Sequence, residues 1–395
     1  MPHVAIIGAG PAGLTAACAA ASLGARVTLL EGGPRVGRKI LASGNGRCNL
    51  SNTAIMREAY NQPDFVAPVL TAVGVDQLRD YFTSLGLSTY ADSENRVYPT
   101  SNVANSVLDV LRLEAAHLGV KTRLNLQVKK VTAVEGGGFE MLSTDGDRVS
   151  ADYVIVSTGG GTSLLADFGH TIVPFSPVLG PIRTSVDTIK RLSGIRVRCS
   201  ATLLDVDGPD GRELGSESGE LLFRDYGASG IMIFDLSRAL EGATVLKLDF
   251  FPSTPAESLR ELFTQRADEL SWRTIETFLD GLTHHILAQA LIAAADLDPA
   301  AKITVASAEA LARIAKDFRL EVLGAGEAKQ AQVTRGGADV SEFDPGTLES
   351  KLVPGVFAAG EVLDVDGRCG GYNLHWAWAS GLVAGAVVAQ KDGAV

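Results

Sequence analysis

The N-terminal segment contains a glycine pattern that few folds accommodate. An apolar run at residues 4–7 leads into Gly8-Ala9-Gly10-Pro11-Ala12-Gly13, and a second apolar run ends at Glu31. This is the G-x-G-x-x-G fingerprint between a strand and a helix, with an acidic residue ending the next strand. Gly8 permits a sharp turn, Gly10 lets a pyrophosphate approach the backbone, and Gly13 lets the helix lie close to the strand. The segment predicts a Rossmann-like unit that binds an ADP-containing dinucleotide.

The carboxylate of Glu31 suits a ribose that carries no 2′-phosphate. It would accept hydrogen bonds from both ribose hydroxyls of the adenosine, and its charge disfavours a phosphate there. The helix N-terminus offers N–H donors and the positive end of its dipole to the pyrophosphate. A tight turn without ligand is the weaker interpretation, because strand, helix, second strand and acidic terminus all occur at the expected spacing. The fingerprint alone does not distinguish NAD from FAD.

Composition limits the remaining classes. The chain has 395 residues, of which 46% are hydrophobic and 21% charged, which is typical of a folded globular protein of two to three domains at about 150 residues each. The net charge of -11 argues against nucleic-acid binding, which depends on clustered Lys and Arg. The four cysteines include no C-x-x-C pair, so we expect neither disulfides nor a zinc site. We therefore expect the protein to be located in a reducing cytoplasm. Residues 2–25 lack charge, but their glycines and the missing basic flank argue against a membrane span or signal peptide.

Two further segments favour FAD over NAD. The segment at 36–52 follows the second strand, and its small and polar residues would let backbone amides approach a ligand that extends beyond the pyrophosphate. The segment at 355–361 is a strand ending in Gly360, followed by Glu361. A second acidic strand end is useful when the ligand also carries a ribitol chain.

At these residues the sequence resembles the aminoacetone-oxidase-like (BaiN-like) NAD(P)/FAD-dependent oxidoreductases, within the glutathione-reductase-type two-dinucleotide-binding flavoproteins. The resemblance runs nearly end to end. It is most specific at residues 43–52, 360–367 and 370–381, and 96–99, 158–161 and 333–337 also fit. His375 departs from the family pattern, which more often has Gln at that position.

Carried over to this sequence, the resemblance implies a set of cofactor-binding residues. The ADP half would be held by Gly8, Gly10, Pro11, Ala12, Gly13 and Glu31, with the backbone of Val128 at the adenine. The path from pyrophosphate to flavin would be lined by Lys39, Ser43, Gly44, Asn45, Gly46, Arg47, Cys48 and Asn49, with Thr158, Gly159 and Gly160 on the pyrophosphate side. Gly360 and Glu361 would hold the ribitol, and Gly371, Tyr372, Asn373 and Leu374 would place a helix N-terminus at the isoalloxazine N1–O2 edge. A positive dipole end there stabilises the negative charge that develops on reduction.

The sequence indicates fewer residues for the chemistry itself, because a flavin performs the difficult step. His375 and Tyr372 are the candidate catalytic proton donors, although a packed histidine explains His375 equally well. Cys48 and Cys369 are interpreted as small residues in tight loops rather than as a redox pair.

Other charged residues give weaker signals. We expect Arg35, Arg38, Lys39 and Arg47 to neutralise phosphate. The pair His284-His285 lacks partners at ligand spacing, so no metal is predicted.

The expected architecture is an α/β fold. A Rossmann-like FAD-binding domain of the glutathione-reductase type, residues 1–185 and 336–395, is interrupted by a β-barrel-like insert (186–253 and 316–335) and a helical insert (254–315). We expect the insertion to cover the flavin and shape the substrate pocket. Helical spacing at 64–85 and 103–118 and a helix at 376–388 are expected, with short strands at 124–128 and onward to 156.

The expected function is that of a cytoplasmic FAD-dependent oxidoreductase that moves hydride between flavin N5 and a small organic substrate. The resemblance implies reduction of a conjugated C=C bond or oxidation of a small amine, with NAD(P)H or O2 as the other partner. A flavin-dependent RNA-modifying enzyme and a non-catalytic flavin-binding redox protein are the alternatives. The substrate, the choice among NADH, NADPH and O2, and the oligomeric state stay open.

Overall fold

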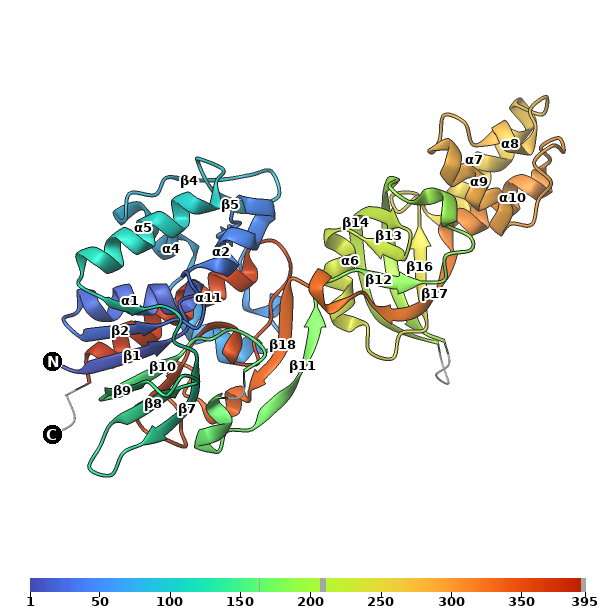
Figure 1. The fold of residues 1–395 in the computed structure, drawn as a ribbon. Coiled ribbons are helices and arrows are strands. Elements are labelled where there is room, and N and C mark those ends of the chain that lie inside the picture. The colour runs from blue at the N-terminus through green and yellow to red at the C-terminus, as the bar shows by residue number, and fades with distance from the viewer. Residues whose placement is uncertain (163, 207–210, 392–395) are drawn as a thin grey trace. The chain divides into compact units, whose positions relative to one another are not determined.

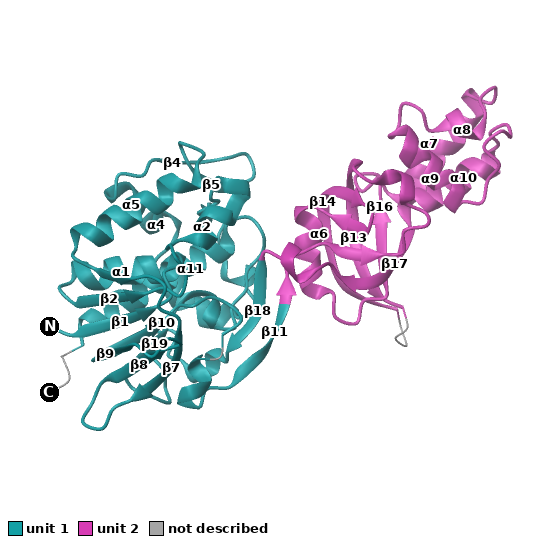
Figure 2. Cartoon of the chain, in the orientation of Figure 1, with its two compact units in different colours: residues 1–176, 333–395 teal, residues 177–332 magenta. Residues whose placement is uncertain are grey.

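The computed structural model describes residues 1–162, 164–206 and 211–391. This part of the chain divides into two compact units (Figure 2): residues 1–176 with 333 onward form unit 1, and Pro177–Gln332 form unit 2. The sequence placed these boundaries near 185 and 336. The first boundary instead falls inside β11 (Ile172–Val178), because the early part of this strand pairs with β18 (Val333–Ala338).

Unit 1 is built on a parallel sheet (Figure 1). Its strands lie in the order β19 (Val356–Ala358), β10 (Tyr153–Val156), β1 (His3–Ile7), β2 (Arg26–Leu30) and β6 (Lys121–Arg123). The three inner strands are almost wholly apolar and buried, as a sheet covered on both faces requires. The C-terminal β19 extends the sheet formed by the N-terminal strands, pairing with β10.

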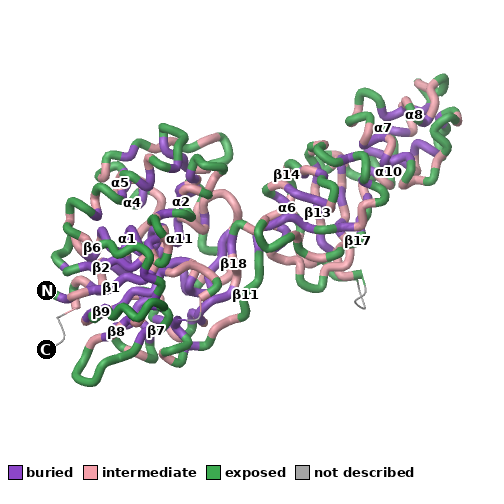
Figure 3. The backbone as a smooth tube through the Cα atoms, viewed as in Figure 1, coloured by how far each residue is buried: buried purple, intermediate pink, exposed green. Residues whose placement is uncertain are grey.

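Two apolar helices pack against each other beside this sheet: α1 (Pro11–Ser22) and α11 (Tyr372–Ala389). Buried residues are concentrated along them and along β1 and β2 (Figure 3). The other helices of unit 1 are α2 (Arg38–Ala42), α3 (Pro63–Ala72), α4 (Val75–Ser84) and α5 (Ala104–His117). The helical spacing at 64–85 is divided between α3 and α4, because Gly74 adopts an extended conformation as the N-cap of α4. The last helix begins at Tyr372 rather than at Trp376.

Two small antiparallel sheets complete unit 1. One has the order β3 (Ser51–Asn52), β5 (Arg96–Pro99), β4 (Thr89–Ala91), and the other is a meander of β7 (Val128–Ala133), β8 (Phe139–Ser143) and β9 (Arg148–Ala151). The expected strand at 124–128 is wrong. Residues 121–123 instead pair with β2 in the main sheet, and Leu126 is held by a backbone hydrogen bond to Glu31 O of 2.9 Å.

Unit 2 has its own core, around a closed barrel. The barrel order is β12 (Ile182–Thr184), β15 (Gly227–Ser229), β14 (Arg212–Arg224), β13 (Arg196–Asp205), β16 (Val245–Asp249) and β17 (Phe318–Ala325). Its helices are α6 (Ile231–Leu236), α7 (Ala256–Glu269), α8 (Ile275–Phe278), α9 (His285–Ala294) and α10 (Val305–Lys316). The expected fold class, a Rossmann-like domain interrupted by a barrel with helices, is confirmed. Over the described ranges, no helix combines the length and apolarity needed to cross a membrane.

The contact between α1 and α11 depends on glycine. A Cβ at Gly385 would lie 2.4 Å from Ala16 O, which is a backbone atom that cannot move aside cheaply. We expect Gly385→Ala to lower the free energy of unfolding by about 1–3 kcal/mol, as overpacking does in other cores. Urea unfolding followed by tryptophan fluorescence measures this. The control Ala386→Ser, at a half-buried neighbouring position, should change it by no more than about 0.5 kcal/mol. An unchanged urea midpoint for Gly385→Ala would contradict this, because it would show that the two helices can move apart with no loss of stability.

Candidate functional site

The glycine-rich turn between β1 and α1 is shaped by two close backbone contacts. Gly8 has φ +102°, and a Cβ there would lie 2.5 Å from Ser157 O. A Cβ at Gly13 would lie 1.8 Å from Gly8 O, so no other residue fits. Around Gly10, by contrast, nothing lies within 4 Å of the Cβ position. The turn therefore packs tightly against its own protein at two glycines and leaves open space at the third.

The N-terminus of α1, which is the positive end of its helix dipole, has neither a side-chain cap nor an acidic residue in its first turn. Its N-cap Gly10 gives no side-chain hydrogen bond, Pro11 opens the helix, and the first turn contains no acidic residue. Beside it, the carboxylate of Glu31 at the end of β2 accepts hydrogen bonds from Ala9 N (3.0 Å) and Gly33 N (2.8 Å). These bonds fix the Glu31 side chain next to the turn, as the ribose-binding role requires.

The expected adenine contact lies along the same edge. Val128 is the buried first residue of β7, and the segment before it is hydrogen-bonded to Glu31 O through Leu126 N. The structure thereby brings together Gly10, Glu31 and the approach to Val128, which are far apart in the sequence.

The loop after α2 contains several residues in the left-handed backbone conformation. Gly44 and Asn45 have φ values of 57° and 54°, and Cys48 has φ 58°. Ser43 anchors the loop, because its Oγ donates to Ile40 O (2.8 Å) and its carbonyl accepts from Cys48 N (3.1 Å). The guanidinium of Arg47 lies 4.7 Å from the centre of the Tyr98 ring, a cation–π contact.

A largely buried carboxylate, that of Glu361, lies shortly after the C-terminal strand β19. Glu361 Oε1 is buried and has no hydrogen-bond partner among the described residues, and Oε2 lies 3.8 Å from Lys39 Nζ. Burial raises the pKa of this carboxyl, and the nearby Lys39 and the amides of Thr334 and Gly160 oppose that rise. A buried acceptor without a partner is costly unless a ligand satisfies it.

A second buried polar atom without a partner lies close by. The hydroxyl of Thr158, which follows β10, has no hydrogen-bond partner in the described structure. The Cβ position of Gly159 is 3.8 Å from Glu361 Oε2, so the two segments are adjacent. Sequence analysis missed Thr334, which packs at 2.7 Å from the Cβ position of Gly160 and whose amide faces Glu361. Its place in the matching stretch 333–337 was the available signal.

The N-terminus of α11 is held in place by side chains of the loop before and within β3. Gly371, its N-cap, has φ +104°, and its first turn has neither a side-chain cap nor an acidic residue. Its amide donates to Asn49 Oδ1 (3.2 Å) in the Asn49 orientation that satisfies both ends of the side chain. Asn373 Oδ1 accepts from Gly367 N (2.8 Å), and Leu374 packs on the core. Gly360 O accepts from Trp376 Nε1 (3.3 Å), which joins the Glu361 segment to this helix.

The structure argues against both candidate proton donors. The hydroxyl of Tyr372, a buried residue, donates to Ala54 O (3.0 Å). His375 is completely buried, with Nδ1 at 2.8 Å from Ser51 Oγ and Nε2 at 3.1 Å from Val73 O. Burial lowers the pKa of His375 from 6.5 to about 4, opposed by the hydrogen bond to Val73. A neutral, enclosed imidazole is suited to holding structure rather than to delivering a proton.

Cys48 behaves as a small residue of the core. Cys48 is fully buried, and burial raises the pKa of its thiol to about 12, which makes it a poor nucleophile. The described residues contain no group of three or more metal-ligating side chains.

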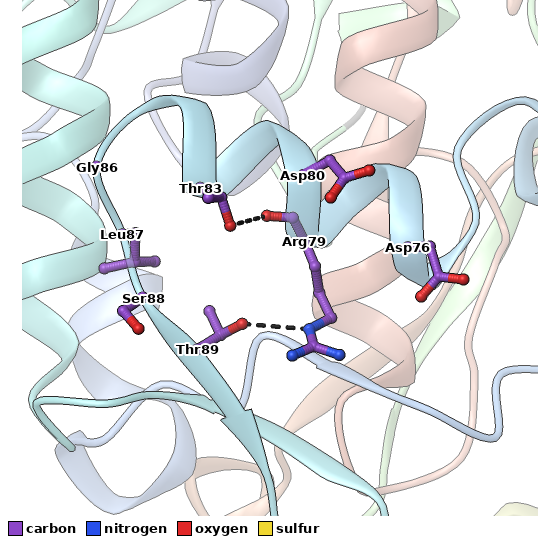
Figure 4. A pocket seen from close by; sticks show the side chains of 8 residues that line it. All are labelled: Asp76, Arg79, Asp80, Thr83, Gly86, Leu87, Ser88 and Thr89. Atoms are coloured by element: carbon purple, nitrogen blue, oxygen red, sulfur yellow. Dashed lines mark hydrogen bonds between the residues drawn. The ribbon is translucent and has the colours of Figure 1, made fainter.

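A groove of about 490 Å³ lies between α4 and β4 (Figure 4), and it contains none of the residues expected at the site. Arg79 crosses it and donates from Nε to Thr89 Oγ1 (3.3 Å). Because the groove is open and Arg79 is bonded to Thr89 within it, the cluster around Glu361 is the better candidate site.

Taken together, these features fit an extended dinucleotide. Two uncapped helix N-termini suit electron-rich groups, the open space at Gly10 suits a pyrophosphate, and the atoms without partners at Thr158 and Glu361 suit the hydroxyls of a sugar or ribitol chain. FAD combines all of these groups.

The chain is similar to known proteins over nearly its whole length. The family model described as HI0933-like protein Rossmann domain matches residues 2–387. The chain is 34% identical to the 3-dehydro-bile acid delta(4,6)-reductase of Clostridium scindens, over 99% of this chain and 100% of that protein. It is 28% identical to the ribosomal RNA dihydrouridine synthase of Escherichia coli, over 95% of each chain. Among solved structures, an open conformation of a flavocytochrome c3 fumarate reductase is similar, with a TM-score of 0.48 and 18% identity over 98% of this chain and 78% of that one.

The buried state of His375 predicts a pH dependence of stability. Its pKa is 6.5 in the unfolded chain and about 4 in the folded one, so the unfolded state binds a proton first as the pH falls. The resulting stability, roughly 3 kcal/mol, is fully present above pH 6.5 and is lost as the pH falls towards 4. Urea unfolding of the protein and of His375→Gln, measured between pH 4 and 7, isolates this contribution as a difference. Parallel pH profiles for the two proteins would contradict it.

The Oε1 atom of Glu361, which has no hydrogen-bond partner in the described structure, predicts that a substitution here affects stability and cofactor affinity in opposite directions. We expect Glu361→Gln to leave the stability of the FAD-free protein unchanged or higher, because an ionisable group no longer needs to be buried. The dissociation constant for FAD should rise by about tenfold, through loss of a charge-assisted hydrogen bond. The control is Glu349→Gln, which removes a carboxylate already bound to Gly355 N and Lys391. It should lower stability and leave FAD affinity unchanged, and the reverse pattern would remove Glu361 from the site.

Proposed function

The chain belongs to the HI0933-like Rossmann family of FAD-dependent oxidoreductases, and we propose that it reduces a carbon–carbon double bond conjugated with a carbonyl group. The observation that carries the proposal is the 34% identity, over the full length of both chains, with a protein named as a 3-dehydro-bile acid delta(4,6)-reductase. That name describes removal of double bonds in conjugation with a 3-oxo group. We favour this reaction over the oxidation of a small amine for that reason.

The dihydrouridine synthase similarity supports the same bond chemistry on a different substrate. Dihydrouridine is uridine with a saturated C5–C6 bond, and that bond is conjugated with the C4 carbonyl. Both named activities therefore place hydride on the far carbon of a carbonyl-conjugated double bond and a proton on the near one. We propose a small organic substrate for this chain, because a net charge of -11 opposes the phosphate backbone of RNA.

The chain's own residues bind and orient the cofactor in this proposal. Bound FAD supplies hydride transfer at its N5 atom. The turn at Gly8 to Gly13 and Glu31 would hold the ADP half, the segments around Thr158 and Glu361 the pyrophosphate and ribitol, and the first turn of α11 the pyrimidine edge. Lys39 would neutralise charge beside Glu361, to which it is already paired. Neither Tyr372 nor His375 is proposed as the proton donor, because carbonyl oxygens already accept their hydrogens.

We further propose NAD(P)H as the reductant, since a reductase needs an electron source, and the cytoplasm as the compartment. Three of the four cysteines, Cys18, Cys48 and Cys199, are buried as thiols in the described structure, which fits a reducing environment.

The proposed reaction is tested by anaerobic absorbance measurements on the purified yellow protein. We expect NADH or NADPH to bleach the flavin band, and a 3-oxo-4,6-diene steroid acid to restore it with formation of the saturated product. The matched control is the corresponding 3-oxo steroid without ring double bonds, which should restore nothing. Restoration by an unmodified ribosomal RNA fragment, with dihydrouridine formed, would instead assign the RNA substrate. Bleaching by a primary amine alone, with no response to the diene, would overturn the proposal.

A further inference from the structure

His375 is the first residue of α11 whose side chain hydrogen-bonds to two other elements at once. Its Nδ1 lies 2.8 Å from Ser51 Oγ in β3, and its Nε2 lies 3.1 Å from Val73 O at the end of α3. A carbonyl oxygen only accepts, so Nε2 carries the hydrogen, and Nδ1 accepts from the Ser51 hydroxyl. The pair of bonds thus defines one neutral tautomer, with a donor at one end and an acceptor at the other.

The turn that His375 anchors is also held by the side chains of Tyr372 and Asn373 and through its backbone. Gly371 N donates to Asn49, Gly370 O accepts from Asn52 Nδ2 (3.0 Å), and Tyr372 O accepts from Tyr60 OH (2.9 Å). These contacts fix the residues that lead into α11 and its first residue. The bonds of His375 fix the other end of the first turn, where the helix begins to run inward.

The charge of this turn gives the anchoring a functional consequence. The N-terminus of α11 has no side-chain cap and no acidic residue, so its positive end is left for a ligand. A second observation also indicates a ligand in this region: Glu361 Oε1 has no hydrogen-bond partner in the described structure. The segment that contains Glu361 is joined to α11 by the hydrogen bond from Trp376 Nε1 to Gly360 O. A displaced or tilted first turn would weaken the interaction of its amides with charge on that ligand, because the effect falls off within one turn.

We propose that His375 is a positioning residue that sets the reduction potential of the bound flavin. Its neutral imidazole bridges β3 and α3, with one hydrogen-bond donor and one acceptor, and thereby fixes the first turn of α11. The inference rests on the proposed flavin site. A glutamine side chain offers the same pair, an amide N–H donor and a carbonyl acceptor, and replaces the imidazole without adding charge. Leucine has a comparable volume and offers neither.

The test measures the midpoint potential of the flavin in the holoenzyme, by equilibration with a reference dye and without substrate. For His375→Leu we expect a more negative midpoint potential. The ratio of the protein's affinities for reduced and oxidised flavin should fall by about 2- to 30-fold, which corresponds to the interaction energy of a helix N-terminus with a nearby charge. His375→Gln should restore the potential of the unaltered protein.

The matched control is His170→Leu. His170 is also buried in unit 1 and also bridges two groups, Glu342 and Ser350, at 2.8 Å each, and neither partner belongs to α11. Its loss should lower the thermal midpoint and leave the flavin potential unchanged. An unaltered potential in His375→Leu, an equal shift in His170→Leu, or a glutamine variant that behaves like leucine would each overturn the proposal.

A milder variant keeps the test decisive where His375→Leu does not fold. Ser51→Ala removes one of the two bonds and should shift the potential in the same direction by a smaller amount, whereas no shift would contradict the role of the bridge. The potential is read without substrate. A protein that reduces no diene yet shows these shifts would therefore refute the proposed function and leave this inference standing.

Discussion

The close approach of backbone to backbone around α1 is the constraint from which the rest of unit 1 follows. The carbonyl of Gly8 occupies the position where a side chain at residue 13 would begin, and the carbonyl of Ala16 occupies the corresponding position at residue 385. The first contact seats α1 on the sheet, and the second seats α11 on α1. Because dispersion and sterics act over fractions of an ångström, these contacts leave little freedom in where the two helix N-termini stand.

That fixed placement explains why uncompensated polar groups persist in a well-packed interior. Helix ends are usually capped and buried acceptors are usually satisfied. Here α1 and α11, like most helices of the described chain, begin without side-chain caps, and Thr158 and Glu361 each bury an oxygen without a partner in the described structure. Each of these features costs stability in the protein alone, and a polyhydroxylated, anionic ligand would recover that stability by supplying the missing partners. The proposed site would then be preorganised, with its cost in stability present before the ligand binds.

The histidine at the start of α11 shows how a residue in a functional region can act without touching the chemistry. His375 was a reasonable proton donor from sequence, since a histidine beside a flavin is often an acid. Its two hydrogen-bond partners and complete burial make it neutral and inaccessible. Family membership and the relatives identify an FAD-dependent oxidoreductase. In the proposed double-bond reduction, a group other than His375 would supply the proton.

The sequence by itself determined the dinucleotide turn, the α/β class and the presence of an insertion. The dinucleotide turn is a local feature: a strand, a turn whose glycines stand at fixed spacing, and an acidic strand end are all visible within thirty or so residues. What it could not determine was anything set by distant partners. The division of 64–85 at Gly74, the start of α11 at Tyr372, and the pairing of residues 121–123 with β2 depend on neighbours elsewhere in the chain. The same holds for the site, because only the tertiary structure places Ser51 and Val73 on either side of His375, and burial between them decides the protonation state of that ring.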